Sequence, residues 1–228
     1  MDNGRTVIVT GGAGGLGGAA VSAFVADGWR VVAPVRPGRA SSLPKGATPV
    51  EGDLGEPADV ASAIEVAAGE PDAPLRAVIN LVGGFASHGL VAETPIDDFE
   101  TMLRLNLRPT YLVTAAALPH LVAAGGGSIV CVSSRAALSP FPGAVGYATA
   151  KAAVLAFANT VAVEYRKQKV RCNTVLPSVI DTPANRSGMG GDPSRWVRPE
   201  DIAAVLLFLA SDASSPTSGA QIPVYGQA

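Results

Sequence analysis

Short apolar segments alternate with longer amphipathic segments along the chain, and this alternation restricts the possible folds more than any other feature of the sequence. It predicts strands over 6–10, 30–35, 48–51, 77–81, 128–133, 170–176 and 221–225, and helices over 15–27, 57–68, 95–122, 146–167 and 199–210. Most strand segments are continuously apolar, which is typical of strands buried on both faces. Crossovers of this length join parallel strands. The sequence therefore predicts an α/β fold in a single domain, with a doubly wound, mostly parallel seven-stranded sheet and helices on both faces.

Two segments interrupt this regular pattern. Pro109 lies inside the longest helical segment, so 95–122 is expected to bend or to form two helices. Residues 182–198 are rich in Gly, Pro and Arg, are irregular in pattern, and follow the sixth predicted strand. Irregular segments in such places often carry function. We therefore expect a short flap over a binding site at 182–198.

The composition excludes several classes of protein. The chain has 228 residues, of which 48% are hydrophobic and 16% charged, so it has enough apolar material for a large core and too little charge for disorder. Its formal net charge of −2 provides no positive field for a nucleic-acid backbone. No apolar run approaches the roughly 18 residues of a membrane span. The first strand begins too close to the N-terminus to leave space for a signal peptide.

Cysteine and histidine are scarce. The chain contains two of each, namely Cys131, Cys172, His88 and His120. These numbers exclude a disulfide scaffold and a metal centre rich in Cys or His, and they are typical of a reducing compartment. We expect a cytoplasmic protein with no bound metal, no nucleic-acid partner and no membrane partner.

A glycine-rich turn follows the first predicted strand. In Thr10-Gly-Gly-Ala-Gly-Gly-Leu-Gly-Gly18, six of the eight residues from 11 to 18 are glycine. Glycines permit positive φ and let backbone N–H groups approach a pyrophosphate at a helix N-terminus. The spacing alone is unspecific, but a dinucleotide-binding fold has its phosphate loop at this place in the chain. No Gly-Lys-Ser/Thr follows, which disfavours a P-loop. Tight helix–strand packing without a ligand is the remaining alternative.

Tyr147 and Lys151 lie four residues apart at the start of a predicted helix, so their side chains share one face. A phenol titrates near pH 10 and transfers protons poorly at neutral pH, whereas a nearby ammonium lowers its pKa and makes it a usable acid or base. Thirteen residues before the tyrosine, Ser134 follows a strand at the sheet edge where open α/β folds bind ligands. Ser133 competes with Ser134 for any role. The alternative for the pair is a surface tyrosine stacked along a lysine stem.

These motifs, in this order and at these spacings, resemble the short-chain dehydrogenase/reductase family over nearly the whole chain. The resemblance rests on Thr10-Gly11-x-x-x-Gly15-x-Gly17, on the serine thirteen residues before the tyrosine, and on Tyr147-x-x-x-Lys151. Residues 173–182 and 201–212 are similar to the family's nicotinamide-contacting segment and to its last large helix. The resemblance implies a Rossmann fold and an NAD(P)-dependent oxidoreductase that interconverts a carbonyl compound and a secondary alcohol by hydride transfer.

The resemblance also implies roles for single residues. Tyr147 would transfer the proton, while Lys151 would lower the pKa of Tyr147 and hold the nicotinamide ribose. Ser134 would hydrogen-bond the substrate oxygen, and Asn106 would support a water that relays protons. Cofactor contacts are implied for Thr10, Gly11, Gly15, Leu16, Gly17, Arg36, Asp53, Leu54, Asn80, Gly83, Tyr147, Lys151, Pro177, Ile180 and Thr182, with Asp53 next to the adenine.

Three segments depart from the family pattern. Asn80-Leu-Val-Gly83 stands where the family has Asn-Asn-Ala-Gly, Pro177-Ser178 where it has Pro-Gly, and Tyr225-Gly-Gln227 where it has Asp-Gly-Gly. These departures affect the cofactor loops and the C-terminal contact, and they leave the four catalytic candidates unchanged.

The end of the second predicted strand bears on the choice of cofactor. An acid about 20 residues beyond the glycine turn accepts hydrogen bonds from the adenosine ribose and repels a 2′-phosphate. Val35 stands at this position, and no Asp or Glu occurs from 28 to 50. Arg36 and Arg39 instead offer guanidinium groups suited to a phosphate. We expect NADP(H) to be preferred over NAD(H); the alternative is that both arginines face solvent.

The sequence leaves the substrate and the assembly less defined. Alternatives on the same fold are a non-catalytic dinucleotide sensor and a scaffold with a vestigial site. The substrate is expected to be a small carbonyl or alcohol compound, and candidate pocket residues, each equally explained by packing or solvation, are Phe85, His88, Arg135, Phe141 and Trp196. The helical segments 95–122 and 146–167 carry Ala, Leu and Val on more than one face, which predicts a homodimer or homotetramer through these helices, as the resemblance also implies.

Overall fold

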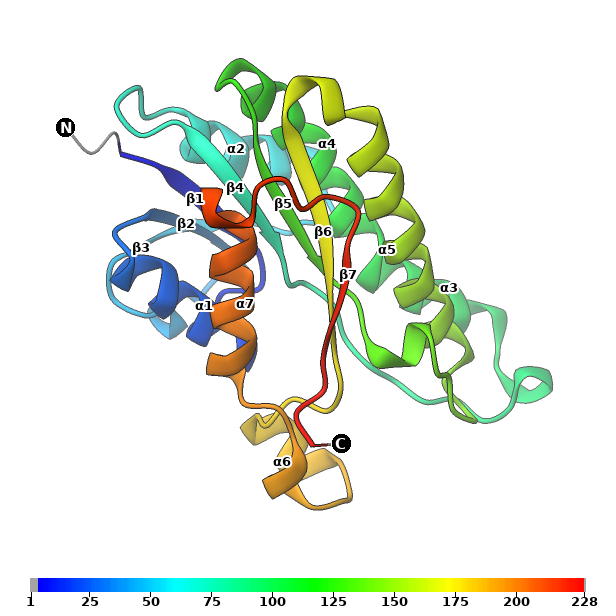
Figure 1. The fold of residues 1–228 in the computed structure, drawn as a ribbon. Coiled ribbons are helices and arrows are strands. Elements are labelled where there is room, and N and C mark those ends of the chain that lie inside the picture. The colour runs from blue at the N-terminus through cyan, green and yellow to red at the C-terminus, as the bar shows by residue number, and fades with distance from the viewer. Residues whose placement is uncertain (1–3, 228) are drawn as a thin grey trace.

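Seven strands form one sheet at the centre of the molecule (Figure 1). The computed structural model describes residues 4–227. The strands are β1 (Thr6–Val9), β2 (Arg30–Val35), β3 (Ala47–Glu51), β4 (Leu75–Asn80), β5 (Gly127–Val132), β6 (Val170–Pro177) and β7 (Gln221–Val224). Their order across the sheet is β3-β2-β1-β4-β5-β6-β7, and every neighbouring pair is parallel. The predicted single-domain, doubly wound sheet is confirmed, with most strand ends within one or two residues of the prediction.

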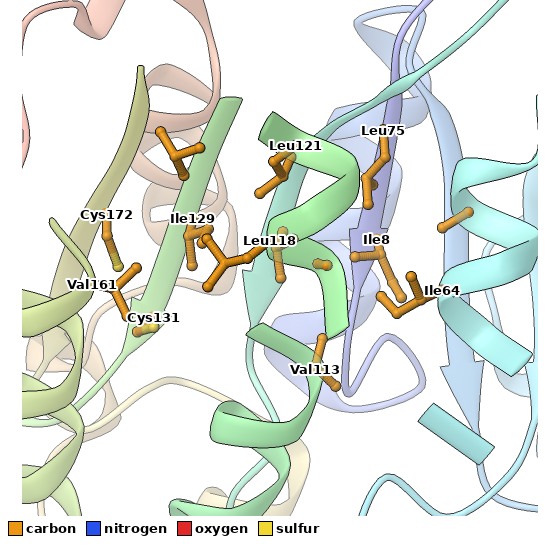
Figure 2. Close-up of a cluster of buried hydrophobic side chains, with 14 of the residues drawn as sticks. Ile8, Ile64, Leu75, Val113, Leu118, Leu121, Ile129, Cys131, Val161 and Cys172 are labelled. Atoms are coloured by element: carbon orange, nitrogen blue, oxygen red, sulfur yellow. The ribbon is translucent and has the colours of Figure 1, made fainter. Parts of the chain in front are cut away.

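Helices cover both faces of the sheet. They are α1 (Gly15–Ala26), α2 (Pro57–Ala68), α3 (Ile96–Asn106), α4 (Arg108–Ala123), α5 (Val145–Glu164), α6 (Pro183–Gly188) and α7 (Pro199–Ala210). One face packs against α1 and α7, and the other against α2, α4 and α5. In Figure 2, Val113, Leu118 and Leu121 of α4 extend toward the strands that carry Ile8 and Ile129.

The continuous apolar runs follow from this two-sided burial. Ile8 belongs to the core beneath α2 and α4, whereas its neighbours Val7 and Val9 belong to the core beneath α1 and α7. Successive strand residues point to opposite faces, so both must be apolar when helices cover both faces. The edge strands β3 and β7 are only partly buried and are correspondingly more polar.

The long helical segment divides as the sequence predicts. α3 ends at Asn106 and α4 begins at Arg108, with Leu107 between them and Pro109 in the first turn of α4. Proline has no N–H to donate, so it is tolerated best in a first turn, although α4 also has Pro119 in its interior. The break places Asn106 at the C-terminal end of α3.

The segment 182–198 is less irregular than expected. It contains α6 and a 3₁₀ turn at Pro193–Arg195. The hydroxyl of Thr182 accepts the N–H of Asn185 at 3.2 Å, and Pro183 occupies the first helical position. This capping stabilises one short helix within a Gly- and Pro-rich segment.

Among residues 4–227, no helix has the length and apolar character that a membrane crossing requires.

Candidate active site

A cleft of about 520 Å³ opens at the edge of the sheet where the strands end. Its walls come from the start of α1, the segments after β4, β5 and β6, the start of α5, and α6. The predicted site residues among its lining are Leu16, Gly83, Ser134, Tyr147, Lys151, Pro177 and Ile180. They come from four separate strand–helix connections, so the strand order brings them together.

A larger groove, of about 1030 Å³, lies at the opposite edge, where the strands begin. None of the predicted site residues lines it. Arg76 donates a hydrogen bond to the carbonyl of Ala124, and Arg171 donates to the carbonyls of Leu209 and Ser211. These guanidinium groups neutralise the C-terminal ends of α4 and α7, which gives them a structural explanation.

Ser134 lies two residues after the end of β5, and Tyr147 lies in the first turn of α5. Both side chains line the cleft, and the Ser134 hydroxyl accepts the N–H of Ala136 at 3.2 Å. Burial raises the pKa of Tyr147 above its ordinary value, and the nearby Ser134 hydroxyl opposes this shift. At neutral pH, Tyr147 is therefore a protonated phenol in contact with the Ser134 hydroxyl.

Lys151 lies one turn further along α5 and is only 6% exposed. Its Nζ donates a hydrogen bond of 3.1 Å to the carbonyl of Val132 and lies 5.9 Å from the centre of the Tyr147 ring. Burial lowers the pKa of Lys151 to about 8, and the neighbouring Cys131 opposes this shift. Sequence reasoning expects Lys151 to lower the pKa of Tyr147, whereas in the cofactor-free structure burial raises that pKa.

Ser133 is clearly distinguished from Ser134 by its contacts. It is buried, and its hydroxyl donates a hydrogen bond of 2.7 Å to the main-chain carbonyl of Lys151. Its N–H donates to the carbonyl of Val175 at 2.9 Å. Ser134 is therefore the serine that contacts Tyr147, while Ser133 joins β5 to the helix that carries Lys151.

Asn106 does not line the cleft itself but contacts Gly83 and Gly84, which do. Its amide is fully buried, and Nδ2 donates to the carbonyls of Gly84 and Met102, each at 3.0 Å, while Oδ1 accepts the N–H of Gly84 at 3.1 Å. A Cβ added to Gly83 would lie 2.5 Å from Oδ1 of Asn106 and 3.0 Å from Nζ of Lys151. Glycine at position 83 therefore lets the amide and the ammonium approach each other.

The glycine turn is tightly packed in places and open in others. Gly11 has a φ of +70°, and a Cβ added to Gly17 would lie 1.9 Å from the carbonyl oxygen of Gly11. The hydroxyl of Thr10 accepts the N–H of Leu81 at 2.9 Å, so it ties the turn to the end of β4 rather than lining the cleft. A Cβ at Gly15 would lie 2.7 Å from the methyl group of Thr182. Thr182 therefore faces the turn.

The start of α1 is suited to an anion. Gly14 at its N-cap provides no side-chain hydrogen bond, and the first turn contains no acidic residue. The N–H groups of Gly15, Leu16 and Gly17 are those that have no intrahelical acceptor in a first turn. Because Gly14 and Gly15 are exposed, a pyrophosphate would find N–H donors and the positive end of the helix dipole here. The turn therefore fits the dinucleotide that the sequence predicts.

The end of β2 shows an acid that sequence reasoning missed. Arg36 follows β2 and is exposed. Glu51, the last residue of β3, lies in register with Val35, and its carboxylate accepts the N–H of Gly38 at 2.9 Å. Glu51 lies one residue beyond the acid-free stretch 28–50, and the pairing of β3 with β2 places it beside this turn.

The remaining predicted cofactor contacts are placed unevenly. Asp53 is exposed after β3, and its carboxylate accepts the N–H of Gly55 at 2.8 Å, whereas the next residue, Leu54, is buried in the core. The amide of Asn80 is buried, with Nδ2 donating to Thr114 at 3.0 Å and Oδ1 lacking a protein partner. Asn80 does not line the cleft.

Three of the five candidate pocket residues line the cleft: Phe85, Arg135 and Phe141. The other two do not. His88 lies with Nε2 at 3.9 Å from a carboxylate oxygen of Asp98, and Trp196 is buried in the chain after α6. Position in the sequence did not distinguish these two from the others, because the direction of a loop side chain depends on the packing of the loop.

The family model for short chain dehydrogenase matches residues 5–189. The chain belongs to the short-chain dehydrogenase family. Among curated relatives, it is 30% identical over 246 residues to 2-(R)-hydroxypropyl-CoM dehydrogenase of Xanthobacter autotrophicus, with 97% of each chain covered. It is 32% identical over 244 residues to D-threitol dehydrogenase of Mycolicibacterium smegmatis, with 98% of this chain and 92% of the relative covered.

Solved structures of short-chain dehydrogenases resemble this fold closely. A short-chain type dehydrogenase/reductase from Mycobacterium ulcerans has a TM-score of 0.89 and 27% identity, over 98% of this chain and 89% of the other. ElxO with NADP bound has a TM-score of 0.87 and 26% identity, over 98% of each chain. The family, the Rossmann-like fold and the oxidoreductase class expected from the sequence are confirmed. Members of this family use a nicotinamide dinucleotide, and the relatives named above are dehydrogenases of small molecules.

Proposed function

We propose that this short-chain dehydrogenase interconverts a carbonyl compound and a secondary alcohol, with NADP(H) as the preferred cofactor. The observation that carries the proposal is the meeting of Ser134, Tyr147 and Lys151 in one cleft beside the uncapped start of α1. Asn106 supports this set from behind through Gly83 and Gly84. The alternatives on this fold, a sensor or a scaffold, do not require these groups to meet.

Ser134, Tyr147 and Lys151 have distinct roles in the proposed reaction. The bound nicotinamide supplies or accepts the hydride. Ser134 donates a hydrogen bond to the substrate oxygen, and Tyr147, kept protonated by its raised pKa, donates the proton that this oxygen needs during reduction. Lys151 carries the positive charge that favours the resulting phenolate. In oxidation the same proton returns to Tyr147.

Asn106 and Lys151 position other groups and take no part in the hydride transfer itself. The amide of Asn106 fixes the Gly83–Gly84 backbone between itself and the lysine. We propose that this arrangement supports a water through which Lys151 exchanges protons with solvent. In the same proposal the ammonium of Lys151 also holds the ribose hydroxyls next to the nicotinamide.

The NADP(H) preference rests on the end of β2. Arg36 and Arg39 are exposed, and neither forms an ion pair within residues 4–227. A free guanidinium is well suited to the 2′-phosphate. Glu51 opposes this preference, because its carboxylate lies on the same turn. The solved structure of ElxO contains NADP, which supports the proposed preference of this chain for NADP(H).

The remaining elements of the proposal concern the flap, the assembly and the location. We propose that α6 and the chain to Arg198 cover the cofactor, since Thr182 faces Gly15 and Asn185 lines the cleft. A homodimer or homotetramer would cover exposed apolar side chains on α3, α4 and α5, including Ile96, Tyr111 and Val163. The two buried free cysteines are compatible with the cytoplasm.

The experiment that tests the function is a turnover screen with both cofactors. Ketones, quinones, pterins and acyl thioesters are offered with NADPH or NADH, and cofactor oxidation is followed by absorbance. We expect turnover with at least one class and a higher kcat/KM with NADPH. Cofactor binding without turnover of any class would favour the sensor, and no cofactor binding would favour the scaffold.

A further inference from the structure

One wall of the cleft is aromatic and incompletely covered. The Phe85 ring meets the Tyr147 ring edge to face at 5.1 Å and lies 6.0 Å from the Phe141 ring. Although both phenylalanines line the cleft, they are 48% and 46% exposed. Exposed aromatic side chains in a concave site mark a surface that a ligand covers. The wall begins at the reacting phenol, so its occupant is the part of the substrate next to the carbonyl carbon.

An exposed cation, Arg135, lies in the same cleft. Arg135 directly follows Ser134 and lines the cleft, and its guanidinium carbon lies 5.2 Å from the centre of the Tyr225 ring. Its guanidinium forms no ion pair within residues 4–227. Stacking on an aromatic ring restrains the side chain while its N–H donors stay available.

No acidic residue balances this cation. The residues that line the cleft include neither Asp nor Glu. Asp181, beside the flap, is paired through both oxygens with Arg186. Lys151 is the other cation of the cleft, but it is buried and its Nζ is held by the carbonyl of Val132. Arg135 is therefore the group that an anionic substituent of the substrate would meet.

We propose that the substrate is an aromatic ketone, or the corresponding secondary alcohol, that carries a carboxylate, and that Arg135 recognises this carboxylate. The inference rests on the proposed function, because it places the carbonyl at Ser134 and Tyr147. The ring packs on Phe85 and Phe141, and the carboxylate accepts hydrogen bonds from the guanidinium. A guanidinium and a carboxylate match in geometry, and such charged hydrogen bonds are stronger than neutral ones.

The first test measures binding, without turnover. Calorimetry at saturating NADP⁺ compares 4-ethylbenzoate with its neutral amide, 4-ethylbenzamide, which has the same ring and nearly the same shape. We expect the benzoate to bind about 10- to 100-fold more tightly to the wild-type protein, as charged hydrogen bonds imply. In Arg135→Ala this preference is expected to disappear, and in Arg135→Lys to be retained in part.

Two variants serve as controls. Arg166→Ala removes an exposed guanidinium beside the groove at the opposite edge of the sheet and should leave the preference unchanged. Phe141→Ala should weaken both ring ligands by a similar factor, of about 3- to 10-fold for a lost aromatic contact, without changing their ratio. Equal binding of benzoate and benzamide to the wild-type protein would overturn the proposal. A loss of NADP⁺ affinity in Arg135→Ala as large as its loss of benzoate affinity would also overturn the proposal, because the guanidinium would then bind the cofactor.

The second test measures turnover of 4-acetylbenzoate and 4-methylacetophenone with NADPH. We expect a kcat/KM about 10-fold or more higher for the carboxylate, lost in Arg135→Ala. Turnover of both ketones without this preference would overturn the carboxylate proposal and leave the proposed function in place. Tight, Arg135-dependent binding of the benzoate without turnover of any ketone would support the recognition site and contradict the proposed function.

Discussion

The hydroxyl of Ser133 donates a hydrogen bond of 2.7 Å to the main-chain carbonyl of Lys151, while the ammonium of Lys151 donates to the carbonyl of Val132. Val132, the last residue of β5, and Ser133, which follows it, therefore fix both the side chain and the main chain of Lys151. Strand and helix are thereby fixed to each other at the point where Ser134, Tyr147 and Lys151 must align. Small displacements of catalytic groups lower rates considerably.

Ser133→Ala should lower kcat by about 3- to 10-fold through misplacement of Lys151, and the free energy of unfolding by about 1 kcal/mol through loss of the hydrogen bond. Ser133→Thr retains a hydroxyl and should restore most of the rate. Steady-state kinetics and urea unfolding of the same variants separate the two effects. A loss of stability with an unchanged kcat would assign Ser133 a purely structural role.

Tyr147→Phe should abolish turnover and leave the affinity for the cofactor nearly unchanged, because only the proton-bearing oxygen is removed. General acid–base catalysis contributes about 10²- to 10⁴-fold. Stopped-flow or steady-state assays measure the rate, and fluorescence titration measures NADPH binding. A variant that keeps more than about a tenth of the wild-type kcat would exclude Tyr147 as the proton donor.

Lys151→Met should stabilise the cofactor-free protein at pH 7 by roughly 1–3 kcal/mol while removing activity. Burial lowers the pKa of Lys151 to about 8 in the folded chain, against an ordinary value of 10.5. Below pH 8 both states bind this proton, and the full penalty of burying the charge is present. Between pH 8 and about 10.5 the unfolded chain binds more protons, so the free energy of unfolding rises with pH.

Urea unfolding of both proteins from pH 6 to 10.5 measures this difference. Tyr147 and the two cysteines are present in both proteins, but Cys131 is electrostatically coupled to Lys151, so the difference between the variants reports Lys151 together with this coupling. The stability advantage of the methionine variant should shrink as pH rises above 8. An advantage that does not change with pH would contradict the lowered pKa.

Arg36→Ala should weaken NADPH binding by about 1.5–3 kcal/mol and leave NADH binding almost unchanged, because it removes a charged hydrogen bond to the 2′-phosphate. Calorimetric titration with each cofactor measures both affinities. Glu51→Gln provides the opposite change: it keeps an acceptor for the N–H of Gly38 and removes the negative charge beside the turn. It should strengthen NADPH binding selectively. Equal losses for both cofactors in Arg36→Ala, or a wild-type preference for NADH, would contradict this assignment.

Self-association through α4 and α5 should be visible by light scattering at micromolar protein. The Tyr111 ring of α4 meets the Phe157 ring of α5 edge to face, with the ring centres 5.9 Å apart; Tyr111 is 54% exposed, and Val163 of α5 is 68% exposed. Asp in place of Tyr111 and Val163 should reduce the mass toward the monomer of 22.9 kDa, whereas Val66→Asp on α2 should not. A wild-type mass near that of the monomer would end the idea.

The sequence by itself determined the sheet, the order of its elements and the family. When helices cover both faces of a sheet, both sides of each central strand must be apolar. The sequence shows this as consecutive apolar residues such as Val7, Ile8 and Val9. Tyr147 and Lys151 were predictable as neighbours because helical geometry sets the relation between residues four apart. A break at Pro109 was predictable because proline lacks an N–H, although Pro119 lies inside α4 without ending it.

The tertiary structure decided what depends on contacts between distant segments. Glu51 lies beside the Arg36 turn only because β3 pairs with β2, and the sequence separation of 15 residues gives no sign of it. Ser133 and Ser134 are adjacent in sequence, yet one faces the helix backbone and the other faces Tyr147, because successive residues at a strand end point in different directions. Burial raised the pKa of Tyr147 and lowered that of Lys151, and burial is a property of the packed molecule, set by all the segments that surround a side chain.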